Sequence, residues 1–509
     1  MDFIESWRKT VSNELGKPDI PAGEILGHPK ALWQLFNIEL WERFAYYGMR
    51  AVLAPYVAIV FFSHLNSGEA NAQASLVYGG YTALVYATGI VGGYIADRVL
   101  GYQRSILLGA LIMASGLFML LIPEMKMFLV GLALIVAGNG LFKPNISTMV
   151  GQLYAPDDIR RDSGFTIFYM GINLGALAAP LVTATWIGAK YGYQWGFFAA
   201  GIGMLLSTLF LEFAKKSLGR VGLPPEGDEG WGKFFAVGAG ALVAVPVIYF
   251  LLSESVILGY ILVIIMIGLV IYFVASGIKS RDKVQLHRYI AMLILFLANA
   301  IFWSLFEQAG SSMNFLAKDF VDLDTGLFTI HFAAFQSVNP LFILLLAPLF
   351  AMLWPWLEKR KLNPSIPRKF GLGLVQVGFG FFILVFAINN MQNTAGLIPW
   401  FMLMLCYFFH TTGELCLSPI GLSMVTKLAA PKEVGLAMGG WFLSIAMAQY
   451  IAGIIAAVAS GGEGGHAEAA SSISQYATVY WQLFILGLVF GGAYLLLAPK
   501  FDKLMHGVK

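Results

Sequence analysis

Charged residues and cysteines are both scarce in this sequence. Asp, Glu, Lys and Arg make up 12% of the 509 residues, whereas soluble domains carry roughly 25%. Hydrophobic residues make up 58%, the net charge is only +3, and the basic residues form no patch for nucleic acid. The composition therefore excludes a soluble or nucleic-acid-binding protein and predicts an all-α polytopic protein in a lipid bilayer.

The two cysteines, Cys406 and Cys416, fall in one predicted helix. Ten residues of helix separate them by roughly 15 Å, which excludes an intrachain disulfide. The sequence also lacks the His-Glu-x-x-His helix of metalloproteases and the Gly-x-Ser-x-Gly turn of hydrolases. We therefore expect no enzyme activity, no metal site and no cofactor. The first thirty residues lack an apolar core, so we expect no signal peptide.

Long apolar runs dominate the rest of the chain. A membrane-spanning helix needs about 20 residues, and we identify fourteen runs of this kind: 31–62, 76–97, 104–123, 127–151, 164–187, 193–213, 234–252, 255–277, 288–315, 327–356, 370–389, 396–426, 434–459 and 478–498. An even number of spans puts both chain ends on the same side of the membrane.

Lys and Arg are distributed unevenly over this predicted topology. With the N-terminus in the cytoplasm, nearly all of the 32 Lys and Arg fall in inner segments. The exceptions are three residues in outer segments and three within spans: Lys126, Lys190, Lys318, Arg43, Arg50 and Lys143. This agrees with the positive-inside rule, so we expect both termini to be cytoplasmic.

A polar stretch from Gly219 to Lys233 divides the chain. The two runs that follow it contain no charged residue and predict a peripheral, lipid-facing hairpin outside any solute pathway. Six spans precede this hairpin and six follow it, a common plan for transporters with a central cavity. We expect a cytoplasmic N-terminal segment, a first six-helix bundle, a linker with the inserted hairpin, a second six-helix bundle and a cytoplasmic tail: 1–30, 31–217, 218–286, 287–499 and 500–509.

The first span carries an unusual group of polar residues. Their spacing is helical and places them on one broad face: Glu39, Glu42, Arg43, Tyr46 and Arg50. Charged groups inside a membrane are costly and usually face a water-filled cavity. One interpretation is a static ion-pair network that holds helices together. The interpretation that we favour is a site that binds a charged solute or relays protons.

Later spans also contain polar residues. Lys143 precedes Pro144, which frees a backbone carbonyl and permits bending. We favour a cavity-facing Lys143 over a purely structural ion pair. Four further candidates for the same cavity are Asn173, Glu307, Asn339 and Glu414. For Asn173, a hydrogen bond between helices is an equal alternative. Trp441 is a candidate for an apolar pocket, although an aromatic residue in a span more often serves packing.

The second span ends in a segment rich in glycine and charge. Its glycines allow close helix contact, and Asp97 is followed by Arg98 and Arg104. We expect these three charges to form a lock at the inner face, with a loop of solvated charges as the alternative. The pattern Gly-x-x-x-Asp-Arg, followed by Gly and Arg, resembles the loop signature of the major facilitator superfamily.

Three motifs resemble the signatures of the proton-dependent oligopeptide transporter family. They are Glu39-x-x-Glu42-Arg43-Phe44-x-Tyr46-Tyr47-Gly48, Phe168-Tyr169-x-x-Ile172-Asn173-x-Gly175 and Gly413-Glu414-x-x-x-Ser418-Pro419. The resemblance covers nearly the whole chain, and the central hairpin is similar to that of bacterial members. It implies the major facilitator fold, with 14 transmembrane helices in two six-helix bundles plus a two-helix insertion. It also implies a cell (inner) membrane location and function as a monomer.

The resemblance further implies import of di- and tripeptides with protons, by alternating access. The peptide carboxylate would be held by Arg43, Lys143 and Tyr47. Its amino group would be held by Glu414, Asn173 and Asn339. The pocket would also include Tyr46, Tyr86 and Trp441. Proton coupling would involve Glu39, Glu42, Arg50 and Glu307, with Arg50 paired to Glu307.

Two expectations concern details of this site. Gly79 stands where animal members of the family and some bacterial ones have a histidine, so we expect the carboxylates to carry more of the proton coupling. We expect Glu42 to be the resting partner of Lys143. The main alternative function is a carrier of another anion such as nitrate, or of a peptide-like metabolite, and a channel is a more remote one.

Overall fold

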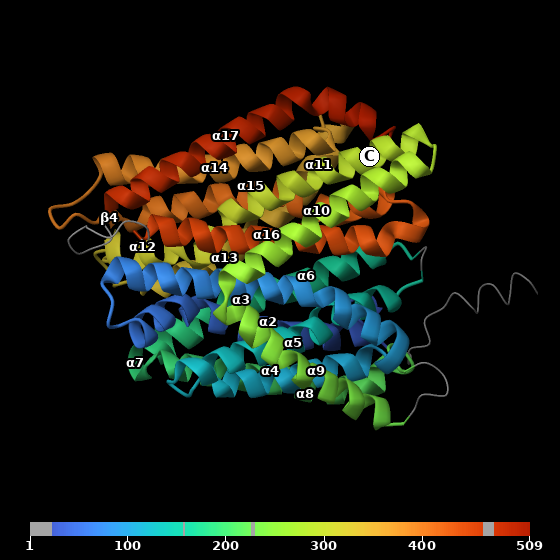
Figure 1. Cartoon of the computed structure of the whole chain (residues 1–509), viewed down its shortest axis with the longest axis horizontal. Coiled ribbons are helices and arrows are strands. Elements are labelled where there is room, and N and C mark those ends of the chain that lie inside the picture. The colour runs from blue at the N-terminus through green and yellow to red at the C-terminus, as the bar shows by residue number, and fades with distance from the viewer. Residues whose placement is uncertain (1–22, 156–157, 225–229, 462–472, 509) are drawn as a thin grey trace, which may run out of the picture.

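The computed structural model describes residues 23–155, 158–224, 230–461 and 473–508. Nearly all of this described part is helical, and fourteen of its helices are long and apolar enough to cross a membrane. The predicted number of spans is therefore confirmed. Most spans run along the longest axis of the molecule, which is horizontal in Figure 1, so the molecule has two distinct ends.

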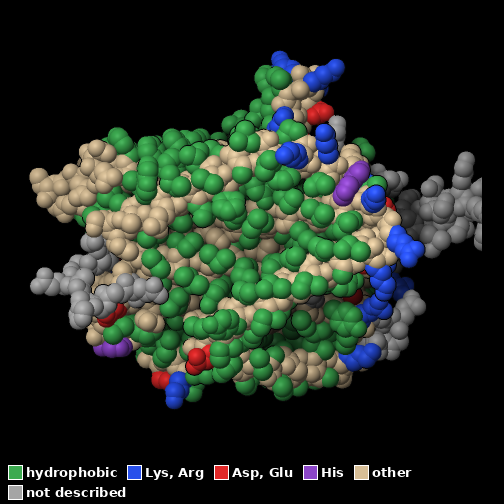
Figure 2. Space-filling model, turned by 45° about the horizontal axis from the view of Figure 1, so that its top comes forward, with side chains coloured by type: hydrophobic (Ala, Val, Ile, Leu, Met, Phe, Trp, Pro, Cys, Tyr) green, Lys and Arg blue, Asp and Glu red, His purple; other side chains and the backbone are tan. Residues whose placement is uncertain are grey.

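The two ends differ in charge. Figure 2 shows most of the visible Lys and Arg side chains gathered towards the right-hand end. We call this the basic end, and it holds the start of the first span and the loop before Arg161. There Arg160 donates hydrogen bonds to the Glu24 carboxylate at 2.8 Å and to the Gly27 carbonyl at 3.0 Å. We call the other end the opposite end.

The first bundle consists of the six spans before the hairpin. Two of them continue from an α-helix into a π-helical segment. Their elements are α2 (Lys30–Phe61), α3 (Ser67–Ile95) with η1 (Ala96–Leu100), α4 (Tyr102–Met119), α5 (Met125–Gln152), α6 (Arg161–Pro180) with η2 (Leu181–Gly188) and the short α7 (Ala189–Tyr191), and α8 (Tyr193–Leu218).

The second bundle consists of the six spans after the hairpin. Its elements are α11 (Lys283–Phe306) with η3 (Glu307–Gly310) and α12 (Ser312–Phe320), η4 (Phe332–Ser337) with α13 (Val338–Lys359), α14 (Ile366–Asn390), α15 (Trp400–Leu428), η5 (Pro431–Glu433) with α16 (Val434–Ala459), and α17 (Ile473–Leu504). Between the bundles in sequence lies the hairpin of α9 (Gly232–Ser253) and α10 (Ser255–Lys279).

Four two-residue strands join loops at the two ends. The strands β1 (Glu24–Ile25) and β2 (His28–Pro29) form an antiparallel pair just before α2. The strands β3 (Val321–Asp322) and β4 (Ile398–Pro399) pair in parallel within the second bundle. These strands are too short to form a core, so the fold depends on helix packing.

Two predicted spans differ most clearly from the structure. The span predicted from residue 76 begins at Ser67, because Asn66 caps the helix by accepting from the Glu69 N–H at 2.9 Å. Its polar first turns escape a search for apolar runs. The span predicted over 288–315 is interrupted by the 3-10 segment η3. There Gly310 has no room for a side chain, because the Tyr78 hydroxyl of α3 lies against it.

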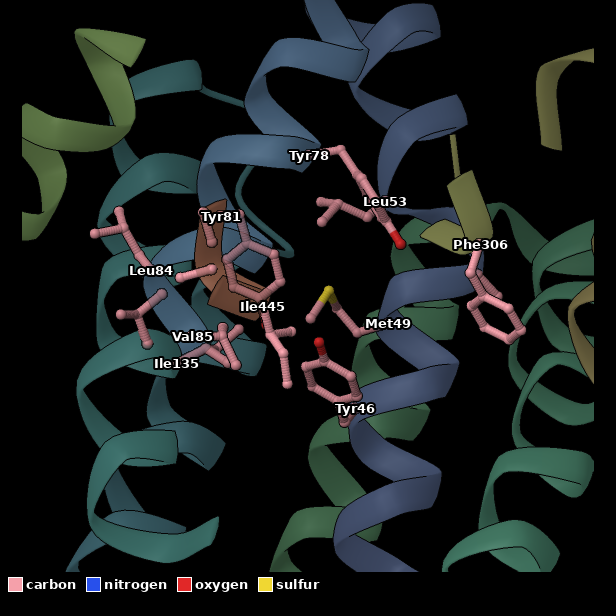
Figure 3. Packing of buried hydrophobic residues seen from close by; sticks show 14 of the residues in the cluster. Tyr46, Met49, Leu53, Tyr78, Tyr81, Leu84, Val85, Ile135, Phe306 and Ile445 are labelled. Carbon is pink, nitrogen blue, oxygen red and sulfur yellow. The ribbon is translucent and has the colours of Figure 1, made fainter. Parts of the chain in front are cut away.

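The apolar core of the first bundle continues to the boundary with the second. Figure 3 shows Tyr46, Met49 and Leu53 of α2 near Tyr78 and Tyr81 of α3. These residues belong to one continuous cluster of buried apolar residues, which also includes Phe306 of α11 and Ile445 of α16. The two bundles are therefore in apolar contact at this depth, and polar groups in the same region need partners.

Candidate functional site

A cavity of about 570 Å³ lies between the two bundles. It extends from Arg43 and Tyr46 in α2 to the exposed Asp97 in η1, so it reaches the basic end. Most of its lining comes from α2, α3, α5 and α16: Arg43, Tyr46, Val85, Tyr86, Gly89, Gly93, Tyr94, Asp97, Asn139, Lys143, Pro144, Ser147, Thr148, Phe165, Gly435, Met438, Gly439 and Phe442. A few charged groups in a largely apolar wall suit a small solute with a charged end.

Two acids and two bases are paired beside this cavity. Lys143 of α5 is paired with Glu39 of α2, and Arg43 is paired with its neighbour Glu42. Arg43 Nε also lies 3.4 Å from Glu39 Oε1. Both carboxylates are fully buried, whereas 33% of the Lys143 side chain is exposed. Lys143 is also a lining residue, so an anion in the cavity can approach this partly exposed side chain.

The prediction that Glu42 is the resting partner of Lys143 is wrong, because Glu39 takes that place. Residues three apart on a helix point about 60° away from each other, so Glu39 faces α5 while Glu42 stays with the Arg43 guanidinium. The second oxygen of Glu39, Oε2, is buried and has no hydrogen-bond partner among the described residues.

Close contact between α3 and α5 places Lys143 beside the cavity. Gly92 of α3 lies so near the Gly140 carbonyl of α5 that a side chain at position 92 would overlap it. Lys143 follows Gly140 by three residues and so lies on nearly the same face of α5. Pro144 follows and lacks an N–H, which interrupts the hydrogen bonds of α5 at this point.

A second charge pair connects the two bundles. Arg50 of α2 donates to the Glu307 carboxylate of η3 and to the Tyr78 hydroxyl of α3. The Arg50 guanidinium carbon also lies 5.5 Å and 5.9 Å from the ring centres of Tyr78 and Tyr47, within the range of cation–π contacts. The structure thus joins the pair that the resemblance implies. Sequence reasoning missed Tyr78, an aromatic residue without charge in a span.

The second bundle presents an acid with an amide partner. Asn339 Nδ2 of α13 donates to Glu414 Oε2 at 2.9 Å and to Thr411 Oγ1 at 3.0 Å, both on α15. Glu414 is buried in α15. In this structure the cavity reaches neither Glu414 nor Asn339, which are absent from its described lining residues.

Asn173 and Tyr47 also stand outside the described lining of the cavity. Asn173 is buried in α6, where its amide donates to the Tyr169 carbonyl one turn earlier at 2.9 Å. Tyr47 is half-buried, and the Arg43 guanidinium carbon lies 5.8 Å from its ring centre. Tyr86, by contrast, is half-buried in α3 and lines the cavity.

Comparisons with known proteins give one consistent result. A family model described as the POT family matches residues 103–469. "Peptide transporter YePEPT" of Yersinia enterocolitica is 35% identical, over 96% of this chain and 98% of that protein. "Di-/tripeptide transporter" of Lactococcus lactis is 38% identical, over 84% of this chain and 89% of that protein.

A solved structure agrees. The crystal structure of a peptide transporter, POT, in complex with sulfate is 38% identical and superposes with a TM-score of 0.82, over 96% of this chain and 98% of the other. The chain belongs to the POT family. Its fold is accordingly the major facilitator fold with a two-helix insertion, and it is a multi-pass membrane protein. The predicted family and fold are both confirmed.

A further expected pocket residue of this POT protein also stands outside the described lining of the cavity. Trp441 is buried in the second bundle, where its ring centre lies 6.1 Å from that of Phe296 and 6.4 Å from that of Phe370. Its neighbour Phe442 lines the cavity instead. Adjacent residues of a helix point about 100° apart, and the motif alone did not fix which aromatic residue faces inward. Phe442 is therefore a cavity residue that sequence reasoning missed.

The segment with the expected charge lock lies at the basic end. Asp97 is exposed and accepts a hydrogen bond from Tyr102 at 2.5 Å. Arg104 donates to the Gly230 carbonyl at 2.9 Å, and its guanidinium carbon lies 4.9 Å from the Trp231 ring centre. Arg98 is exposed. A lock between Asp97 and the two arginines stays a prediction.

At the opposite end, direct contacts join the two bundles of the POT protein. Asn314 Nδ2 of α12 donates to the Ala51 carbonyl of α2 at 3.0 Å, and Ser337 Oγ donates to the Leu177 carbonyl of α6 at 2.8 Å. A Cβ atom on Gly79 would lie only 2.7 Å from Gly453 Cα. Position 79 therefore has no room for a side chain in this conformation.

His331 forms a further contact between the bundles at this end. Its Nε2 lies 3.4 Å from the Tyr193 hydroxyl of α8, and its Nδ1 accepts from the Ala333 N–H at 3.3 Å. Burial lowers the pKa of His331, so the ring stays neutral and Nδ1 can accept. The conformation described here is thus closed at the opposite end, with its cavity reaching the basic end.

Proposed function

We propose that this protein is a proton-coupled symporter of di- and tripeptides that works by alternating access. The observation that carries the proposal is the charge arrangement between the bundles. Lys143 and Arg43 lie on one side and the Glu414–Asn339 pair on the other, with a cavity that reaches one end only. The family and the peptide transporters among its relatives support the same function. This is a transport activity, not an enzymatic one.

In this proposal the peptide carboxylate exchanges places with a protein carboxylate. It binds the ammonium of the partly exposed Lys143, and Arg43 and the Tyr47 hydroxyl complete its contacts. Charge-assisted hydrogen bonds of this kind are short and strong. Lys143 then shares or leaves its bond to Glu39, so the free energy of binding depends on how easily Glu39 is neutralised.

The peptide amino group binds on the other side. Glu414 accepts from the ammonium, while Asn339 and Asn173 supply amide oxygens. For this the cavity must extend towards Glu414, which requires Asn339 to release its bond to that carboxylate. Tyr46 and Tyr86 line the space between the two charged ends, and Trp441 supports it by packing.

Proton coupling follows from the same exchange. A buried carboxylate that loses its cation takes up a proton more readily. When the substrate binds Lys143, the freed Glu39 becomes such a site, and Glu42 follows if Arg43 is also drawn to the substrate. Separation of the bundles at the opposite end breaks Arg50–Glu307 and leaves Glu307 to take up a proton. Closing the bundles around neutralised groups then costs less free energy than closing them around bare charges.

Topology and assembly complete the proposal. The basic end faces the cytoplasm of a bacterial cell, both termini are cytoplasmic, and the opposite end faces outward across the inner membrane. The segments 1–30, 31–217, 218–286, 287–499 and 500–509 act as the N-terminal segment, first bundle, linker with hairpin, second bundle and tail. One chain is sufficient for transport, and the proton gradient drives it without a cofactor.

Uptake into liposomes tests this function. We expect an inward proton gradient to drive accumulation of a labelled dipeptide, and a protonophore to abolish it. We expect unlabelled di- and tripeptides to compete, whereas tetrapeptides and nitrate do not. Counterflow of labelled against unlabelled dipeptide identifies a carrier rather than a channel. Competition by nitrate with no effect of peptides would contradict the proposal.

A further inference from the structure

The inserted hairpin has the shape of a V whose arms lie on different bundles. Figure 1 shows α9 and α10 meeting away from the basic end and diverging towards it, α9 over the first bundle and α10 over the second. The arm α9 packs on α5, where Leu242 and Val245 share an apolar groove with Val130 and Leu134. The arms join at a turn that contains Glu254.

The other arm, α10, follows α16 of the second bundle over much of its length. A side chain on Gly259 would overlap the Tyr450 hydroxyl, and a Cβ atom on Gly440 would lie 3.0 Å from Leu269 Cδ1. Between these two pairs, a step of ten residues forward along α10 is matched by a step of ten residues backward along α16. The two helices therefore run antiparallel in one constant register. Small residues thus let α10 and α16 approach closely, as at other helix interfaces in membranes.

A buried carboxylate continues this register at the basic end. Glu433, the last residue of η5, accepts from Ser276 Oγ of α10 at 2.8 Å and from the Tyr272 hydroxyl of α10 at 3.2 Å. It also accepts from the Tyr289 hydroxyl of α11. Glu433 is 7% exposed. It lies opposite Ser276 in the same antiparallel register as the two pairs above. The register therefore covers about 25 Å of helix, most of a bilayer.

Glu433 also stands directly before the cavity wall. It precedes the first residue of α16, and its side chain does not cap that helix, because the carboxylate is turned towards α10 and α11. Gly435 and Met438, in the first turns of α16, line the cavity. A group that fixes the start of α16 therefore fixes part of the wall that must move when the basic end closes.

We propose that the hairpin is a two-armed brace, with α9 moving with the first bundle and α10 with the second, and that Glu433 is the positioning residue that fixes α10 to the start of α16. This rests on the alternating access proposed above. When the basic end closes, the diverging ends of the arms approach each other, while α10 keeps its register on α16. The hairpin supplies no described residue of the cavity lining, so it acts on the movement of the bundles and not on the solute.

Distances between spin labels test the movement of the arms. Labels replace Phe235 of α9 and Ile278 of α10, both exposed near the diverging ends, in the full chain with Cys406 and Cys416 changed to alanine. We compare the resting protein with protein that holds a dipeptide at acidic pH. We expect the Phe235–Ile278 distance to change between these conditions.

Two further label pairs make the result decisive. The pair Ile159 and Leu496, both exposed, reports the movement of the bundles themselves. The pair Ile278 and Leu496 reports whether α10 stays with the second bundle. We expect the Ile159–Leu496 distance to change and the Ile278–Leu496 distance to stay constant. If the bundles move while Phe235–Ile278 stays fixed, or if Ile278–Leu496 changes as much as Ile159–Leu496, the brace is overturned and alternating access stands. If Ile159–Leu496 never changes, alternating access is overturned, and the brace with it.

A matched pair of double variants tests Glu433 as the point of attachment. Tyr272→Phe with Ser276→Ala removes both hydroxyls that α10 offers to Glu433. Tyr260→Phe with Ser253→Ala makes the same chemical changes on exposed parts of the hairpin. We expect the first variant to lower the maximal uptake rate several-fold with unchanged dipeptide affinity, and to broaden the Ile278–Leu496 distances. We expect the second to behave as wild type. Equal uptake rates in the two variants would overturn the role of Glu433.

Discussion

The charge pairs beside the cavity and at the opposite end differ in which parts of the molecule they join. Lys143 and Glu39 both belong to the first bundle, whereas Arg50 and Glu307 belong to different bundles. A pair within one bundle can exchange a partner for a substrate carboxylate while the bundles stay in place. A pair between bundles must break before they separate. In the proposed transport cycle, similar ion pairs would therefore have different roles, a binding site where both partners belong to one bundle and a lock where they belong to two.

Breaking the pair between bundles should have the largest effect. Arg50→Met leaves the Glu307 carboxylate buried without its cation, and loss of one partner of a buried pair costs about 3–5 kcal/mol. We expect a lower Tm and no proton-driven uptake. Adding Glu307→Gln removes the stranded charge and should restore the Tm in part, but not the uptake. Normal uptake in Arg50→Met would show that this pair is no lock.

Neutralising the acids of the cavity should disturb stability less. In Glu39→Gln the partly exposed Lys143 keeps contact with water, so its charge is not stranded. We expect Glu39→Gln and Glu42→Gln to fold, to retain counterflow and to lose accumulation driven by a proton gradient. Liposome assays in both modes measure this directly. If both variants accumulate dipeptide normally, these acids serve packing alone.

A steric change tests the closed end without changing charge. Gly79→Ala places a Cβ atom 2.7 Å from Gly453 Cα, and overpacking of this kind costs about 1–3 kcal/mol. We expect it to favour the conformation that is open at the opposite end, seen as a shift in the Ile159–Leu496 label distance. Gly268→Ala, which meets open space on α10, is the control. The same distances in both variants would contradict the tight contact.

The smallest effect should come from Tyr193→Phe. The hydrogen bond to His331 is long at 3.4 Å, so its loss costs about 0.5 kcal/mol. Because burial lowers the pKa of His331, the neutral ring is favoured in the folded protein. The neutral His331 ring therefore contributes fully to the free energy of unfolding above a pH of about 6.5. This contribution is lost as the pH falls towards the lowered pKa of His331. Thermal unfolding of wild type and Tyr193→Phe across this range measures both effects.

The sequence was sufficient for the number of spans, because each span needs a long apolar run and each loop interrupts one. It was also sufficient for the polar face of α2, because helical spacing brings residues such as Glu39 and Arg43 together regardless of tertiary structure. The absence of charged residues in 234–252 and 255–277 predicted that the hairpin lies outside the cavity. These features follow from local chemistry alone.

Other features depend on how helices are rotated and packed, which spacing does not fix. The choice of Glu39 over Glu42 as partner of Lys143 depends on a rotation of about 60°. The inward face of Phe442 instead of Trp441 depends on the rotation of α16. The contact at the break after Phe306, where the Tyr78 hydroxyl lies against Gly310, depends on how α3 packs there. None of these contacts has a signal in the local sequence.

The central claim is that Lys143 leaves Glu39 for the substrate carboxylate. The direct test compares a dipeptide with a free C-terminal carboxylate and the same dipeptide amidated at that end, in wild type and in Lys143→Ala. Removing one half of a buried charge pair costs roughly 2–5 kcal/mol, so the amide should bind wild type much more weakly than the free acid. In Lys143→Ala the two ligands should bind almost alike. If the amide loses the same factor in both proteins, Lys143 does not bind the carboxylate and the account is wrong.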